Sequence, residues 1–304
     1  AIEHTQKTYA EKCPGGNSPT EIEHETMLNV VRASDVVINE IKWLWPGILP
    51  LGKPVVLAGK PGIGKSQISL YIASVVSRGG EWPVTGERCD PGNVLILSAE
   101  DGAEETIVPR LKVYGANLDS IGIIKSIRED DAGERHFDMR RDVDELKIHC
   151  RKLKNVSLVI IDPISSYLIG TDTHRDAAVR SSLLPIIKHS EEQGLCLLAV
   201  THLNKSESMS ALSRVMGSIG FVAASRASYI CLPDPSDADR SMMLPIKNNL
   251  AKDTVGFGYR IEEANVTEEI KAAKIIWDSK HENMTADEAA AVPSESDENA
   301  GDAK

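Results

Sequence analysis

Eight consecutive residues have the types and the spacing needed to bind the phosphates of a nucleotide. They read Gly59-Lys60-Pro61-Gly62-Ile63-Gly64-Lys65-Ser66, which fits the pattern Gly-x-x-x-x-Gly-Lys-Ser. Glycines let the backbone N–H groups of such a loop turn inward toward phosphate oxygens. Lys65 would reach the β- and γ-phosphates, and the Ser66 hydroxyl would bind Mg²⁺. We therefore expect a nucleotide-binding loop here, completed by Gln67 directly after it.

The sequence on both sides of this loop supports the same interpretation. Residues 54–58 form a short apolar run typical of a strand, and residues 66–77 repeat apolar side chains at helical spacing. Strand, loop and helix thus follow in the order that a phosphate site needs, because the positive end of the helix then faces the anion. The alternative, a chance glycine-rich turn, would not explain both flanks.

An aspartate at the end of a second predicted strand could hold the metal ion. Residues 156–161 are an apolar strand that leads into Asp162. The carboxyl ends of parallel strands meet at the ligand-binding edge of a sheet. Asp162 is therefore predicted to hold Mg²⁺ through water. The alternative is an ordinary strand-end aspartate that caps the next turn.

The candidate catalytic base is a glutamate at another strand end. Many ATPases place a glutamate directly after the metal-binding aspartate, but here Pro163 follows Asp162. The strand 93–98 leads to Glu100, so Glu100 is the better candidate to polarise an attacking water. Asp101 is the weaker candidate, and we expect it to cap the following helix.

A histidine follows a third apolar strand, at residues 195–200. His202 could donate a hydrogen bond to the γ-phosphate and sense its loss; the alternative is a structural strand-end histidine. The polar stretch after it contains Lys205 and Arg214, which could contact a phosphate backbone. We expect this stretch to be a mobile loop coupled to the nucleotide, and a plain solvated loop fits the pattern equally well.

Alternating strand and helix patterns predict an α/β fold with a mostly parallel sheet flanked by helices. The predicted strands are residues 54–58, 93–98, 121–125, 156–161, 195–200 and 227–232. The predicted helices are residues 66–78, 103–115, 141–154 and 176–193. Residues 243–247 and 256–261 are expected to add an antiparallel pair at the sheet edge. Residues 265–278 fit a helix or a strand.

Composition limits the kinds of partner and compartment. The net charge of −11 would argue against nucleic acid, but −6 of it belongs to residues 281–304, so a basic patch on the core stays possible. Five scattered cysteines form no C-x-x-C pair, which favours a reduced, cytoplasmic protein without structural zinc. We see no secretory signal and no run near the roughly 20 apolar residues of a membrane span.

Three regions are expected along the chain. Residues 1–32 are predicted to be a flexible arm, with a partner-docking segment as the alternative. Residues 33–280 are predicted to form the nucleotide-binding domain. Residues 281–304 are rich in Ala, Glu, Asp and Ser without an apolar period, so we expect a disordered acidic tail.

Taken together, these motifs resemble those of the RecA-like ATPases. The closest likeness is to the branch of plasmid RepA-type hexameric helicases, which is related to DnaB-type replicative helicases. The resemblance spans roughly residues 33–262, outside the arm and the acidic tail. It rests on the phosphate loop and on these segments in order: Ala33-Ser34-Asp35-Val36, Trp43-Leu44-Trp45-Pro46-Gly47, Ser98-Ala99-Glu100-Asp101, Asp162-Pro163, Thr201-His202 with Lys205, and Gly217-Ser218 followed by Arg226.

The resemblance implies roles for single residues. Lys65, Ser66, Glu100, Asp162 and His202 would form the nucleotide site. Arg226 would be an arginine finger that reaches the γ-phosphate held by a neighbouring subunit; a local salt bridge is the alternative. DnaB-type helicases carry a Lys-x-Arg pair on a later strand, where this chain has Lys247-Asn248-Asn249. This departure favours Arg226 as the finger.

The resemblance also implies a function and partners. We expect an ATP- and Mg²⁺-dependent ATPase that forms a ring, with a hexamer favoured, and acts on single-stranded DNA in replication or recombination. Many members of the branch are encoded by plasmids, phages and other mobile elements. One rival is an ATP-controlled switch or loader that acts on a protein without unwinding. Another is a small-molecule kinase, although residues 126–141 show no arginine-rich lid pattern.

Overall fold

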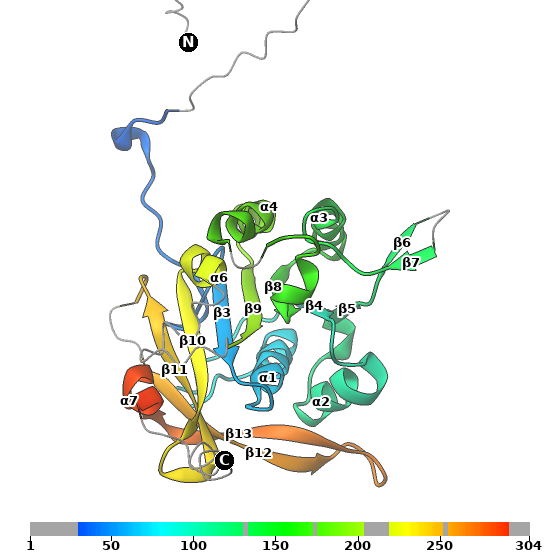
Figure 1. Cartoon of the computed structure of the whole chain (residues 1–304), viewed down its shortest axis with the longest axis vertical. Helices are drawn as coiled ribbons and strands as arrows, with labels where there is room; N and C mark the ends of the chain where they lie inside the picture. The colour runs from blue at the N-terminus through cyan, green and yellow to red at the C-terminus, as the bar shows by residue number, and fades with distance from the viewer. Residues whose placement is uncertain (1–29, 130–132, 173–174, 204–218, 252–254, 292–304) are drawn as a thin grey trace, which may run out of the picture. The chain divides into compact units, whose positions relative to one another are not determined.

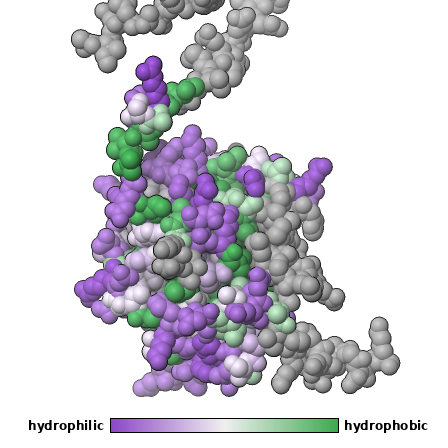
Figure 2. All heavy atoms as spheres, turned by 90° about the vertical axis from the view of Figure 1, so that its left-hand side faces the viewer, coloured by the Kyte–Doolittle hydropathy of each residue, from purple (hydrophilic) through white to green (hydrophobic). Residues whose placement is uncertain are grey.

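The computed structural model describes residues 30–129, 133–172, 175–203, 219–251 and 255–291. The chain divides into two units, residues 1–40 and 41–304, whereas the sequence had suggested that an arm ends at residue 32. The described part of the first unit contains a 3-10 turn, Ala33–Asp35. Its apolar side chains are exposed (Figure 2); these are Val30, Val31, Val36, Val37 and Ile38.

A nine-stranded sheet forms the centre of the second unit (Figure 1), with the order β13-β12-β11-β10-β3-β9-β8-β4-β5. Six neighbouring strands are parallel: β5 (Ile121–Ile124), β4 (Asn93–Ser98), β8 (Val156–Asp162), β9 (Cys196–His202), β3 (Pro54–Gly59) and β10 (Ala227–Asp234). The other three continue the sheet antiparallel: β11 (Asp237–Asn248), β12 (Gly256–Asn265) and β13 (Lys271–Glu282). The predicted RecA-like α/β fold with an antiparallel edge is confirmed.

Helices cover both faces of the sheet, so its central strands are buried on both sides and read as continuous apolar runs. One face packs against α1 (Lys65–Arg78), a π-helical turn (Ala103–Ile107) and α2 (Val108–Val113). The other packs against α3 (Val143–Leu153), α4 (Asp176–Gln193), α6 (Ile219–Ala224) and α7 (Ala286–Ala291). The predicted helices thus lie close to their expected positions.

Short elements complete the second unit. β1 (Trp43–Trp45) pairs with β2 (Leu49–Pro50), and the ring of Trp45 stacks on that of Trp82 with centroids 4.7 Å apart. β6 (Ile127–Glu129) and β7 (Gly133–Arg135) form a separate hairpin. Two further 3-10 turns span Leu118–Ser120 and Ile164–Tyr167.

The C-terminal part of the chain is more ordered than the sequence indicated. The ambiguous stretch 265–278 forms most of β13, which pairs with β12 and continues to Glu282. The prediction of disorder from residue 281 is wrong for α7, because its alanines Ala286, Ala289 and Ala290 are buried in the core. Small side chains let this short helix pack closely, although its composition resembles that of a solvated segment.

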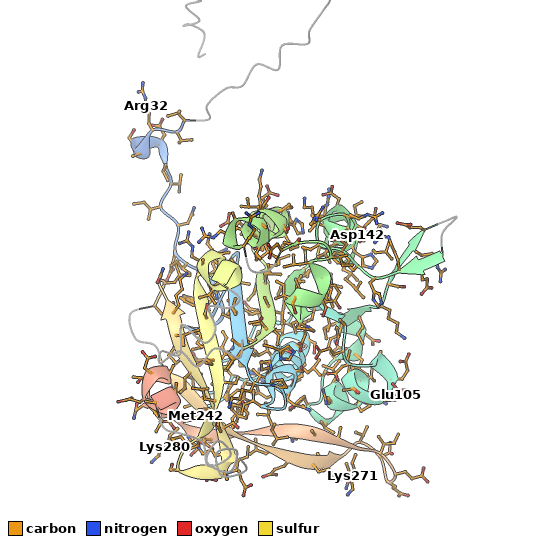
Figure 3. The ribbon with its side chains drawn as sticks, in the orientation of Figure 1. Arg32, Glu105, Asp142, Met242, Lys271 and Lys280 are labelled. Carbon is orange, nitrogen blue, oxygen red and sulfur yellow. The ribbon has the colours of Figure 1, made fainter. Side chains whose placement is uncertain are left out.

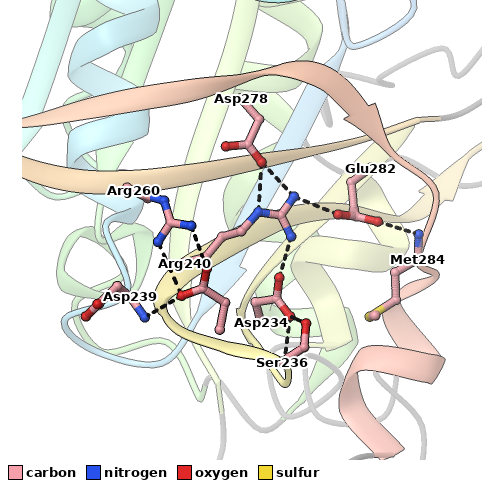
Figure 4. A network of polar contacts seen from close by, with 9 residues as sticks. Asp234, Ser236, Asp239, Arg240, Arg260, Asp278, Glu282 and Met284 are labelled. Atoms are coloured by element: carbon pink, nitrogen blue, oxygen red, sulfur yellow. Dashed lines mark hydrogen bonds and ion pairs between the residues drawn. The ribbon is translucent and has the colours of Figure 1, made fainter.

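An arginine holds the antiparallel edge together (Figure 4). The Arg240 guanidinium donates to Asp278 and Glu282 on β13, at 2.7 Å each, and pairs with Asp234 at the end of β10. A Cβ atom on Gly258 would lie 2.1 Å from both Arg240 Nη2 and Asp278 Oδ2, so only glycine lets this contact cross β12. The contact fixes the β12–β13 hairpin, whose turn end lies near Lys271 and whose far end lies beyond Lys280 (Figure 3).

Candidate nucleotide-binding site

The predicted phosphate loop lies between β3, which ends at Gly59, and α1, which begins at Lys65. Gly62 and Gly64 have φ angles of 79° and 98°, in the left-handed region that favours glycine. A Cβ atom on Gly59 would lie 3.0 Å from the Cys231 carbonyl oxygen of β10. Glycine is therefore required here by backbone conformation and by close packing.

The strand ends named from the sequence meet beside this loop. The register pairs Gly59 of β3 with His202 of β9, and Ser98 of β4 with Asp162 of β8. An open cavity of about 330 Å³ lies at this carboxyl edge of the sheet. Its lining comprises Pro61, Gly62, Gly64, Lys65, Ser66, Gln67, Glu100, Asp101, Arg110, His202, Ile261 and Ala273. Most of the predicted site residues thus share one cavity.

The side chain of Lys65 is buried and makes two polar contacts. Its Nζ donates to the Lys60 carbonyl oxygen at 2.9 Å and lies 3.3 Å from His202 Nδ1. Burial lowers the pKa of Lys65, although the nearby Cys231, Asp162 and Glu100 act in the opposite direction. An ammonium held out of water in this way gains strongly from a phosphate partner.

Two further contacts connect the predicted catalytic groups. His202 Nε2 lies 3.4 Å from Glu100 Oε1, so the imidazole stands between the lysine and the glutamate. The Glu100 side chain is 61% exposed at the mouth of the cavity, where a water could reach it. This arrangement places a potential base next to a group that contacts the phosphate-binding lysine.

Asp162 and Ser66 have the chemistry of a magnesium site. Asp162 is buried, and burial raises its pKa, while a hydrogen bond with Ser66 and the charge of Lys65 oppose the rise. Mg²⁺ commonly takes one or two protein oxygens, with phosphates and waters as its other ligands. In the described residues, no group of three or more His, Cys, Asp or Glu side chains could hold a metal. The paired oxygens of Ser66 and Asp162 fit the smaller requirement of Mg²⁺.

Asp101 has a different role from the one predicted. Its carboxylate pairs with Arg110 at 2.9 Å, and it caps no helix, since Gly102 occupies that position without a side-chain bond. The Arg110 guanidinium also faces the side-chain amide of Gln67. When the Gln67 amide is oriented to satisfy all its neighbours, its oxygen accepts from Arg110 Nε at 2.7 Å and its nitrogen donates to the Ala273 carbonyl at 3.0 Å.

The β12–β13 hairpin lies against the phosphate loop, which the sequence did not predict. The Tyr259 hydroxyl donates to the Ile63 carbonyl oxygen at 2.6 Å. A Cβ atom on Gly64 would lie 2.8 Å from Ile261 Cδ1, so the Ile261 side chain packs directly on the loop. Ala273, on β13, also lines the cavity. The antiparallel edge therefore supports one wall of the site.

Arg226 does not belong to this cavity. Its backbone N–H donates to the Pro54 carbonyl, at the start of β3, and its side chain is exposed. The register places Ala227 beside Val55, so Arg226 lies at the amino end of the parallel strands, roughly 15 Å along them from Gly59. Lys247 lies nearby and donates to the carbonyls of Val222 and Ser225 at 3.0 and 2.7 Å.

Other predictions fall outside the structure or concern the whole chain. Lys205, Arg214 and the segment Gly217-Ser218 lie outside the described residues. Among the helices of the described ranges, none has both the length and the apolar character needed to cross a membrane.

Comparisons with known proteins bear on the fold and the family. A family model described as an AAA domain matches residues 18–208. Among solved structures, the ATPase domain of another protein is similar, with a TM-score of 0.50 and 13% sequence identity over 68% of this chain and 81% of that one. At this identity the likeness shows the fold alone. No curated protein matches the sequence. Because the family model spans more than half of the residues, this chain belongs to the AAA domain family and carries an ATPase domain of that type.

Proposed function

We propose that this chain binds ATP with Mg²⁺, hydrolyses the γ-phosphate and works as a ring-forming motor on single-stranded DNA. The observation that carries the proposal is the line of contacts from Lys65 through His202 to Glu100, beside the phosphate loop. Phosphate binding and water activation are then adjacent in one cavity. The resemblance to hexameric helicases supports the motor role.

The loop would bind the phosphates by means of groups that already face the cavity. The backbone N–H groups around Gly62 and Gly64 and the positive end of α1 favour an anion. Lys65 would exchange its contact with His202 for the β- and γ-phosphates. The cost of burying its ammonium group is then offset by direct charge pairing.

The metal ion would be held by the Ser66 hydroxyl and, through water, by Asp162. When bound, Mg²⁺ neutralises charge that develops on the transferred phosphoryl group. The burial of Asp162 keeps its carboxylate oriented toward Ser66, so this pair needs little rearrangement to accept the ion.

Glu100 would act as the base of the hydrolysis step. It would orient a water and accept its proton as the water oxygen bonds to the γ-phosphorus and the bond to the β–γ bridging oxygen breaks. ADP leaves with that oxygen, and inorganic phosphate is the second product. His202 would hold Glu100 in place and register whether the γ-phosphate is present.

The nucleoside would lie on the hairpin side of the cavity. Ile261 and Ala273 also line an adjoining cavity of about 390 Å³, together with Lys271. Arg110 is fixed by Asp101 at the same wall. This side offers apolar surface and a planar cation to a base, whereas the loop side offers donors to phosphates.

Arg226 supports a ring because it lies far from the loop of its own subunit. An exposed arginine at the opposite end of the parallel strands could contribute to hydrolysis only at the site of a neighbouring copy. A finger supplied in this way would couple turnover to assembly.

Measuring ATP turnover with and without single-stranded DNA, followed by strand displacement on a forked duplex, tests this function. A motor hydrolyses ATP faster on DNA and releases the displaced strand, and the Lys65→Ala variant sets the background. DNA-independent turnover without strand release would favour the switch or loader instead. Absence of any Lys65-dependent hydrolysis would contradict both.

A further inference from the structure

A second cavity, of about 600 Å³, lies at the opposite end of the parallel strands from the nucleotide site. Its walls include Leu51 before β3, Pro91 before β4, Val156 at the start of β8 and Leu195 before β9. These positions are the amino ends of strands whose carboxyl ends form the nucleotide site. Nothing in the proposed hydrolysis uses this cavity, although its volume is typical of ligand pockets.

The lining of this cavity is basic in an otherwise acidic chain. It contains Lys42, Arg88, Arg151 and Lys154 against a single carboxylate, that of Asp90, so its net charge is +3. All four basic side chains are exposed. In the described ranges, only Arg88 among them has an ion pair, a 3.6 Å contact with exposed Glu81, so the charges are available to an anion.

An aromatic side chain stands among these cations. Trp43 lines the cavity and is only partly buried, whereas Trp45 and Trp82 are each 1% exposed in the core. A tryptophan face beside basic groups can stack on a nucleobase while the cations contact phosphates. A purely structural tryptophan of β1 would not need this position.

The floor of the cavity has an unusual and rigid backbone. Lys154 and Asn155 are consecutive non-glycine residues with φ angles of 53° and 37°, a conformation that costs free energy. The Asn93 amide donates to the carbonyls of Leu153 and Lys154, at 3.1 and 3.0 Å, and the Asn155 amide donates to that of Pro91 at 3.0 Å. These bonds hold the floor in one shape, which reduces the ordering cost of binding a ligand.

We propose that this cavity binds a segment of single-stranded nucleic acid, with one base stacked on Trp43 and adjacent phosphates paired with Arg151, Lys154 and their basic neighbours. The proposal rests on the proposed function only in taking single-stranded nucleic acid as the partner. It assigns that partner a site separate from the ATP chemistry, so binding here requires no nucleotide.

Fluorescence anisotropy of a labelled oligothymidylate of about ten nucleotides tests the proposal on the full chain without ATP. Trp43→Ala should weaken binding roughly tenfold, and Trp43→Phe, which keeps a stacking ring, should restore most of it. The double variant Arg151→Gln/Lys154→Gln should weaken binding and reduce the slope of log affinity against log salt by about 1.4, or about 0.7 for each lost phosphate contact.

The matched control removes the same charge elsewhere. Lys112→Gln/Lys280→Gln changes two exposed lysines of α2 and β13 that do not line the cavity, and it should leave the slope nearly unchanged. Thermal unfolding and ATP binding of each variant verify the fold and the separate nucleotide site. Because Arg151 and Lys154 are exposed, their double variant keeps the test valid if Trp43→Ala does not fold.

Three results would overturn the proposal. If the wild-type chain binds the oligonucleotide and all cavity variants bind it equally well, the nucleic acid binds elsewhere and the proposed motor function survives. If no variant and no wild-type chain binds it, both this site and the DNA partner are wrong. If polyglutamate at equal charge displaces it as well as unlabelled oligothymidylate does, the cavity recognises acidic chains and not nucleic acid.

Discussion

The ammonium group of Lys65 lies 3.3 Å from Nδ1 of His202, and this contact defines the state of the imidazole. A lysine ammonium has only donors, so Nδ1 must accept, and the ring proton of a neutral His202 is then on Nε2. That N–H points at Glu100 Oε1, 3.4 Å away. The site therefore contains a directed chain of hydrogen bonds, and a nucleotide that draws Lys65 away would change its first member.

Replacing His202 should separate binding from turnover. In His202→Ala, Lys65 loses a competing acceptor but keeps its phosphate partner, so we expect the Kd for ATP to change less than about threefold. The kcat should fall about tenfold or more, because Glu100 loses its positioning contact. Isothermal titration and steady-state ATPase measurements check the two values.

The conservative variant His202→Gln keeps a side-chain amide that can donate to Glu100, and it should recover part of the kcat. Equal losses of ATP affinity and of turnover in His202→Ala would show that the histidine acts in ground-state binding alone.

The site residues that the sequence identified share one physical origin. Asp162, Glu100 and His202 each follow an apolar strand, and carboxyl ends of parallel strands converge whatever the details of the intervening helices. The local patterns of strand, loop and helix were sufficient to find them. The alternation of these patterns also determined the parallel part of the sheet.

The residues that the sequence missed depend on long-range pairing. Tyr259 and Ile261 contact the loop only because β12 is placed by β11 and β13, and this register has no local signature. Arg110 had no motif of its own, although its position on the helix after Asp101 could have suggested an ion pair. α7 was missed because an Ala- and Glu-rich segment looks solvated until a core accepts its alanines.

Lys65 should cost the nucleotide-free protein stability. Its pKa is lowered in the folded state because burial disfavours the charged form, so the unfolded chain holds the proton more tightly. The cost is present at neutral pH and is relieved as the pH rises through the folded-state pKa. Lys65→Met should therefore raise the melting temperature without nucleotide by at least about 2 °C, where about 2–4 °C corresponds to 1 kcal/mol in a large domain.

Differential scanning calorimetry measures this shift, with Lys112→Met on the exposed face of α2 as the control. The variant should also lose the extra stability that ATP confers on the wild type. A lower melting temperature for Lys65→Met would show that the contacts of Lys65 with Lys60 and His202 outweigh its desolvation.

Arg240 should control how stability depends on pH. Burial alone would raise the pKa of Asp234 and of Glu282, but hydrogen bonds from Ser236, Met284 and Arg240 outweigh it and hold both values low. Their contribution to the wild type is present at neutral pH and is lost only as the pH falls through those low folded-state values. Arg240→Gln leaves clustered carboxylates without a cation, so their pKa values should rise.

We expect Arg240→Gln to lose about 3–5 kcal/mol of unfolding free energy at pH 7, as is typical when one partner of a buried pair is removed. The variant should regain stability between roughly pH 7 and 5 as the carboxylates bind protons, whereas the wild type should not. Urea unfolding at several pH values measures this. Parallel pH profiles of the two proteins would contradict the assigned role of Arg240.

Arg226 provides a test of assembly. Arg226→Ala protomers should bind ATP normally and hydrolyse it poorly, since a finger supplied by a neighbour is worth about 10³–10⁵ in rate where it has been measured in GTPases. Mixed with Lys65→Ala protomers, they should recover activity, because an intact loop then faces an intact Arg226. An ATPase titration of one variant against the other measures this. If mixed oligomers form and no mixture exceeds the sum of its parts, Arg226 is not a shared catalytic group.

The most direct test of the central claim compares Lys65→Ala with Glu100→Gln in ATP binding and in single-turnover hydrolysis. Glu104→Gln, an exposed glutamate on the next turn that is paired with Lys125, is the control and should behave like the wild type. The account predicts that Lys65→Ala loses both binding and turnover. Glu100→Gln should bind ATP normally and hydrolyse it at least about 10²-fold more slowly. Unchanged hydrolysis in Glu100→Gln, or a loss of ATP affinity equal to that of Lys65→Ala, would contradict the assignment of Glu100 as the base.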